Sequence, residues 1–293
     1  MSKLLRGDFI RLFKSKVFWL GIIFMFGLAS MAVYTKWSDS KAFPDYYNPP
    51  DGILLAGALY ISIVIAVFIG IFIGTDYSSG TIRNKHVMGH SRVAMYLSNL
   101  IICVTSSVIM HLVYIAVIVG AAGMGITRKF EMSVGNVTAQ ILTSVFAVSA
   151  ISAILLFVCM LISSRSAGVV SAIILSLMLI FIAGKIDNSL REKEYTSPGY
   201  TITAEEDGEL VYTPQESVKN PKYLTGTKRK VYEFVNDFLP INQISQLMYG
   251  STWTDSEGIG ESNNSAWFPM YSLSLVAVMT TAGVLLFRRK DLK

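Results

Sequence analysis

The sequence is poor in charged residues and in cysteine. Charged residues make up 15% of the 293 positions, hydrophobic residues make up 52%, and the mean hydropathy is +0.50. This composition argues against a soluble globular domain and indicates a polytopic membrane protein. Both cysteines, Cys103 and Cys159, lie inside apolar stretches, so no disulfide framework is expected.

Motifs for nucleotide, metal and proton chemistry are also missing. The sequence contains no G-x-x-x-x-G-K-[ST] phosphate loop, so we do not expect an enzyme that hydrolyses nucleotide by itself or binds a cofactor of its own. His86 and His90 have a spacing that can bind zinc on a helix, but Gly89 between them is expected to end the helix, and no third ligand is nearby. No charged residue lies in the middle of a long apolar stretch, which argues against an ion-coupled carrier.

The apolar residues are concentrated in stretches of about 20 residues, the length needed to cross a hydrocarbon core of about 30 Å. We therefore predict an all-α polytopic membrane protein with six transmembrane helices. They are expected at residues 17–35, 53–75, 97–122, 138–162, 167–186 and 267–287.

The distribution of Lys and Arg predicts the orientation. With the N-terminus inside, the cytoplasmic segments hold 13 basic residues and three acids, Asp8, Asp76 and Asp291. The outer segments hold the other 12 basic and 17 acidic residues, so the net charge of +5 divides into +10 inside and −5 outside. Both termini are therefore expected to be cytoplasmic. The basic balance is a membrane signal, and no nucleic-acid partner is expected.

Three further regions accompany the first five spans, which occupy residues 17–186. Residues 1–16 place Leu5, Phe9, Leu12 and Phe13 on one helical face, with Lys3, Arg11 and Lys14 opposite, which predicts an amphipathic interfacial helix. Residues 187–266 are polar and predict a small α+β extracellular cap. Its expected elements are a β-hairpin around Asp207-Gly208, a helix at residues 228–239 and a helix ending near Gly250. Residues 267–293 hold the sixth span and a basic cytoplasmic tail.

The polar segment at residues 76–97 lies between the second and third spans, on the side expected to be cytoplasmic. A short helix is predicted from Ile82 to Met88, with Ser78, Ser79 or Thr81 as its cap and Gly89 as its end. Ser91 is expected to cap the following helix. The short helix carries Arg83, Lys85 and His86, so we expect a rigid cationic lever that contacts a soluble partner.

Small residues and one histidine stand out within the spans. Small residues at four-residue spacing allow close helix packing in a membrane, within the chain or against a second copy. In the second span they are Ala58, Ser62, Ala66, Gly70 and Gly74. His111 lies near the middle of the third span. It is either a functional group or a neutral imidazole bonded to Ser or Thr of a neighbouring helix.

Together these features resemble the permeases of the type-2 ABC exporter class. The resemblance covers the whole chain and is specific in GTIRNKHVMGHSR, which follows an apolar helix, and in the ending GVLLFRRKDLK. Gly80, Thr81, Ser91 and Arg92 stand where the family has Gly-Thr and a later Ser/Thr-Arg pair. Asp76 stands where Glu is frequent.

The resemblance implies a six-span half-transporter in the cell membrane, bacterial in origin, that works with a second permease subunit and a cytoplasmic ABC ATP-binding subunit. That subunit would bind ATP and Mg. The segment that would contact it comprises Gly80, Thr81, Ile82, Arg83, Asn84, Lys85, His86, Val87, Met88 and Arg92. Antimicrobial peptides, lipids, drugs and ions remain open as substrates. The alternative is a ligand-binding membrane receptor or immunity protein without transport.

Overall fold

The computed structural model describes residues 2–45, 49–196, 199–204, 210–214, 216–250 and 264–290. Among these residues, six helical segments are long and apolar enough to cross a membrane, and they match the six predicted spans in order. Their helices are α2 (Lys16–Ala42), α3 (Gly57–Ser78, after the 3-10 helix η1, Pro50–Ile53), α5 (Arg92–Gly123), α6 (Val134–Leu161), α7 (Arg165–Arg191) and α10 (Phe268–Arg289, after η2, Ser265–Trp267). The fold is that of a multi-pass membrane protein.

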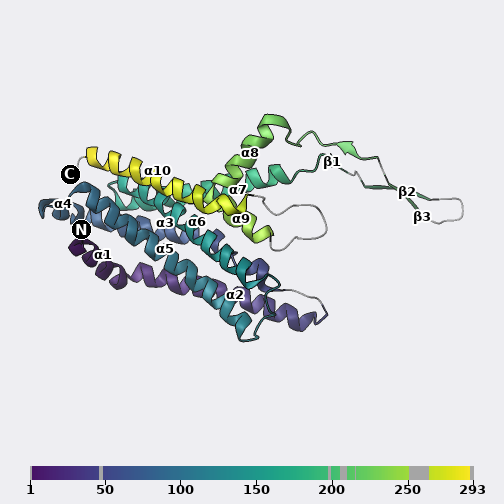
Figure 1. The fold of residues 1–293 in the computed structure, drawn as a ribbon, viewed down its shortest axis with the longest axis horizontal. Coiled ribbons are helices and arrows are strands. Elements are labelled where there is room, and N and C mark those ends of the chain that lie inside the picture. The colour runs from purple at the N-terminus through teal and green to yellow at the C-terminus, as the bar shows by residue number, and fades with distance from the viewer. Residues whose placement is uncertain are drawn as a thin grey trace.

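Both ends of the chain lie at one end of the helical bundle, which we call the terminal end (Figure 1). The short helices α1 (Ser2–Lys14) and α4 (Thr81–Val87) also lie there. At the opposite end, which we call the insertion end, the chain between α7 and α10 forms α8 (Gly226–Phe238), α9 (Pro240–Gly250) and four strands. Both bounds of α8 and the end of α9 are within two residues of those predicted.

The strands form two antiparallel pairs. β1 (Tyr195–Thr196) pairs with β4 (Val218–Lys219), and β2 (Tyr200–Ala204) pairs with β3 (Leu210–Pro214). The second pair is the predicted hairpin and extends away from the bundle in Figure 1. Its expected turn at Asp207-Gly208 lies outside the described residues.

The predicted packing ridge of small residues on α3 is enclosed by the rest of the bundle. All five small residues of that ridge are buried. A Cβ built on Gly70 would lie 2.7 Å from the Cα of Val169 on α7, and one built on Gly74 would lie 2.8 Å from the Cα of Arg165. The small residues Gly168 and Ala172 of α7 are also buried. At Gly70 and Gly74 the ridge therefore packs against α7 of the same chain. The other possibility left open by the sequence, packing against a second copy of the chain, does not apply at these two positions.

Buried hydrogen bonds connect the elements of the insertion end. Asp51 of η1 is 2% exposed and accepts the backbone N–H groups of Glu131 and Met132, which precede α6. Gln243 of α9 donates to the Asp237 carbonyl and accepts from Ser272 of α10 over 2.7 Å. These bonds satisfy polar groups that would otherwise be costly to bury.

Replacing Gly70 with alanine should separate α3 from α7. The added methyl meets a backbone atom, which cannot rotate away, so we expect a loss of about 1–3 kcal/mol in the free energy of unfolding. Detergent-induced unfolding of the purified chain measures the change.

Gly184→Ala on α7 is the matched control, because nothing lies within 4 Å of a Cβ built there. If the two variants unfold alike, the close approach of α3 and α7 is wrong.

Candidate functional site

Helix α4 is a separate seven-residue element because a glycine with positive φ stands on either side of it. Gly80 has φ +69 and is the N-cap residue, and Gly89 has φ +85. Both conformations are easily reached only without a Cβ. The expected capping by a Ser or Thr hydroxyl does not occur at the start of α4.

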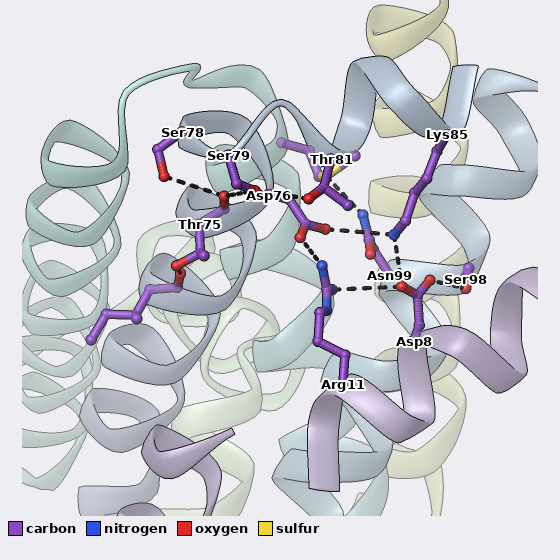
Figure 2. Close-up of polar contacts among 12 residues, drawn as sticks. Asp8, Arg11, Thr75, Asp76, Ser78, Ser79, Thr81, Lys85, Ser98 and Asn99 are labelled. Atoms are coloured by element: carbon purple, nitrogen blue, oxygen red, sulfur yellow. Dashed lines mark hydrogen bonds and ion pairs between the residues drawn. The ribbon is translucent and has the colours of Figure 1, made fainter. Parts of the chain in front are cut away.

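Those hydroxyls instead interact with the end of α3 and with each other. Ser79 Oγ donates to the carbonyl of Thr75 over 2.7 Å and lies 2.8 Å from Thr81 Oγ1 (Figure 2). Ser78 Oγ also donates to the Thr75 carbonyl. They therefore satisfy a C-terminal carbonyl of α3, an alternative partner that a sequence pattern does not distinguish. The expected cap at Ser91 does form, since its Oγ accepts the N–H of Ala94.

The two faces of α4 differ sharply. Ile82 and Lys85 point inward and are 3% and 7% exposed. Five other side chains, four of them on α4 and one on its C-cap residue Met88, are exposed, namely Arg83, Asn84, His86, Val87 and Met88. Val87 is 81% exposed and Met88 69%. We call these five residues the α4 outer face.

Four charged side chains meet beneath α4, and we call Asp8, Arg11, Asp76 and Lys85 the charge cluster (Figure 2). Lys85 Nζ donates to Asp8 Oδ1 over 2.7 Å and lies 3.6 Å from Asp76 Oδ2. Arg11 forms an ion pair with Asp76, and its Nη2 lies 3.7 Å from Asp8 Oδ1. Ser98 of α5 donates to the second oxygen of Asp8 over 2.7 Å. The cluster thus joins α1, α3, α4 and α5.

The side of the N-terminal helix that packs against the bundle differs from the one predicted, because it includes residues of the charge cluster. The sequence pattern placed Arg11 on the polar face, opposite Phe9 and Leu12. In the structure, Leu4, Asp8 and Leu12 are the buried residues of α1, and the guanidinium of Arg11 lies 3.8 Å from the centre of the Phe72 ring on α3. A hydrophobic face assigned from α1 alone misses this, because ion-pair partners elsewhere in the chain allow charged groups to turn inward.

Burial makes these charges depend on one another. Desolvation lowers the pKa of Lys85 below its ordinary value, while the hydrogen bond and the charge of Asp8 act in the opposite direction. Desolvation likewise lowers the pKa of Arg11, and Asp8 opposes it. Two cations and two anions make the cluster neutral, which limits the cost of excluding it from water.

Two further sets of contacts connect helix ends at the terminal end. Arg92 at the start of α5 donates through Nη1 to the carbonyl of Arg288 over 2.7 Å and to that of Lys290 over 2.6 Å. A cation at the C-terminal carbonyls of α10 is favoured by the helix dipole. Lys290 Nζ donates to the Tyr77 hydroxyl and to the carbonyl of Met160, and burial lowers the pKa of Lys290 to about 8. Helices α3, α5, α6 and α10 are therefore linked here.

His111 lies apart from the charge cluster. Its Nε2 is 2.9 Å from Ser144 Oγ on α6, and both side chains are fully buried. This geometry matches the structural alternative, an imidazole bonded to a serine of a neighbouring helix.

The sequence analysis singled out Lys85 and Asp76 in the polar segment. It did not predict that Asp8 and Arg11 contact them. A signal was present, because Asp8 and Asp76 are two of only three acids expected on the terminal side. An isolated acid in a basic segment is a natural partner for a buried cation.

No family model and no curated protein matches this chain.

Substitution of Lys85 with methionine should destabilise the protein by about 3–5 kcal/mol, because Asp8 and Asp76 would then share one cation in a buried site. Arg83→Met on the exposed face of α4 should change the stability by less than about 0.5 kcal/mol. Unfolding in mixed detergent micelles measures both.

Adding Asp8→Asn to Lys85→Met restores neutrality and should recover part of the loss. If Lys85→Met is as stable as Arg83→Met, Lys85 is not a buried cation.

Substitution of His111 with leucine should remove the contact with Ser144 and cost about 1 kcal/mol, the scale of polar contacts between membrane helices. His111→Gln keeps a hydrogen-bonding group and should cost less. Thermal unfolding of the two purified variants makes the comparison, and equal losses would contradict a hydrogen-bonding role.

Proposed function

We propose that this chain is the membrane-spanning permease subunit of an ATP-driven ABC exporter of the type-2 class, with α4 as its coupling helix. One observation carries the proposal: α4 is fixed on its inner face by the charge cluster, whereas its outer face carries large exposed apolar groups. A short helix with one anchored and one free face can receive a force from a soluble partner.

The inner face supports force transmission into the bundle. Lys85 contacts Asp8 of α1 and Asp76 of α3, and Ser98 of α5 contacts the same Asp8. A displacement of α4 would break these buried contacts unless the contacting helices moved with it. Because α3 packs closely on α7 at Gly70, that movement would reach a fifth helix.

The outer face supports a protein partner. Val87 and Met88 expose apolar surface beside the cationic Arg83, and Met and Arg are enriched at protein interfaces. In residues 2–16, 76–95, 161–167 and 286–290 the only acids are Asp8 and Asp76, and both are buried. The exposed basic residues of these segments are Lys3, Arg6, Lys14, Lys16, Arg83, Arg165, Arg288 and Arg289. We therefore infer a partner surface that is acidic around an apolar groove.

In this proposal the terminal end is cytoplasmic, α1 lies in the surface of a bacterial cell membrane, and the partner is the ABC ATP-binding subunit, which binds ATP and Mg. The chain itself does not hydrolyse ATP. A second permease subunit completes the pathway, and the substrate is an antimicrobial peptide, a lipid or a drug. The exposed basic surface fits the cytoplasmic side, where Lys and Arg are favoured.

The test is to purify the chain alone and in complex with its ATP-binding partner, and to measure ATP hydrolysis by each. We expect hydrolysis only in the complex, and turnover by the isolated chain would contradict the proposal.

A variant with Arg83→Glu and Met88→Asp should reduce recovery of the complex about tenfold or more, since it reverses a charge and places another in an apolar contact. Lys16→Glu, exposed at the same end but outside α4, is the control. Equal recovery of the two variants would remove α4 as the docking element.

A further inference from the structure

A second polar site lies at the insertion end, where α8 stands over the end of α7 (Figure 1). A cavity of about 570 Å³ opens between three segments: the last turns of α7, the turn after β4 and the start of α8. We call it the lysine pocket. Its cationic lining residues are Lys185, Lys222 and Lys228, and Tyr223, Leu224 and Tyr232 supply apolar surface.

Hydrogen bonds through Asn220, which is 7% exposed, fix the wall of the pocket. Its side-chain nitrogen donates to Glu192 Oε2 over 2.7 Å and to the carbonyl of Lys193 over 3.1 Å. Its side-chain oxygen accepts the N–H of Lys222 over 2.9 Å. The turn that carries Lys222 is therefore held against the end of α7. The acid that lines the pocket, Glu192, already has a hydrogen-bond donor.

The three lysines contrast with the basic residues around them. Arg191 pairs with Asp187, Lys219 with Glu194, and Arg229 with Glu233. Among the described residues, no carboxylate lies within ion-pair distance of any pocket lysine. The unpaired positive charge is gathered at the cavity, although the segments predicted to be extracellular are acidic overall.

The start of α8 adds to this positive potential. Its N-cap, Thr225, lines the pocket and makes no side-chain capping bond, and its first turn holds no acid. Lys228 and Arg229 follow within the first turns, where the helix dipole disfavours cations. A bound anion would accept the uncapped N–H groups and compensate the lysines.

The surface below the pocket indicates what carries the anion. Ile174, Met178 and Phe181 are exposed along α7, one of the six candidate membrane spans. Lys185 lies one turn above Phe181, with its Nζ 5.9 Å from the ring centre. An anionic headgroup in the pocket would leave its acyl chains along this apolar stripe.

We propose that the lysine pocket binds the phosphate group of an anionic phospholipid. Lys185, Lys222 and Lys228 supply the charge, and the first turn of α8 supplies backbone donors. The inference does not depend on an ATP-binding partner, since it uses other residues at the opposite end of the bundle.

The test uses the purified full chain in a neutral detergent and measures binding of dihexanoyl phosphatidylglycerol by thermophoresis. Removing two of the three charges with Lys222→Gln and Lys228→Gln should raise the dissociation constant at least about tenfold, since each charged hydrogen bond contributes substantially to affinity. Lys230→Gln, exposed on α8 outside the pocket, should bind as the unmodified chain does.

Inorganic phosphate and dihexanoyl phosphatidylcholine separate the possible sources. If phosphatidylglycerol binds and inorganic phosphate does not, the site takes a lipid. Binding of inorganic phosphate that is lost in the double variant would assign the pocket to free phosphate and overturn the lipid assignment. The proposal also fails if phosphatidylcholine binds equally well, if nothing binds, or if the double variant binds phosphatidylglycerol as the unmodified chain does.

Discussion

The terminal end of this protein depends on the neutrality of four charged side chains, of which Asp8, Asp76 and Lys85 are buried and Arg11 is partly buried. Each of Asp8, Arg11, Asp76 and Lys85 would be costly to bury alone, and the four together carry no net charge. The four side chains come from α1, α3 and α4. The ion pairs between them therefore fix the positions of these helices relative to one another. The arrangement also shapes the surface. The acids that could have screened the exposed lysines and arginines are used inside.

Helix α3 connects this cluster with the rest of the bundle. Its last turn supplies Asp76, and Gly74 and Gly70, two and six residues earlier, allow the close approach of the α7 backbone. Close backbone contact leaves little room for the two helices to slide independently, because packed interiors do not absorb extra volume cheaply. The polar anchor and the small-residue contact therefore restrain the same helix at neighbouring levels, which suits the proposed role of α4 as a lever.

The long helices could be predicted from the sequence because a membrane span needs about 20 mainly apolar residues. The mean hydropathy over such a stretch is insensitive to individual residues. The start of α4 and the face of α1 could not. Ser79 had two possible backbone partners, and the sequence does not say which helix end it serves. Lys85 was read as surface because its partner Asp8 lies 77 residues away in the chain. Pattern analysis compares neighbours on one helix, whereas the charge cluster depends on tertiary contacts. For the same reason the lysine pocket, made by three separate segments, left no local motif.

The contact between Arg92 and the end of α10 has a consequence for biosynthesis. Arg92 leaves the ribosome 198 residues before Lys290, whose carbonyl it binds. Until then, its guanidinium has neither of the two carbonyl acceptors it binds in the finished fold, and it must stay hydrated at the membrane surface. The helices synthesised in between must insert and pack while this junction is open. The junction therefore closes only after translation has passed residue 290, when all six candidate spans have been synthesised.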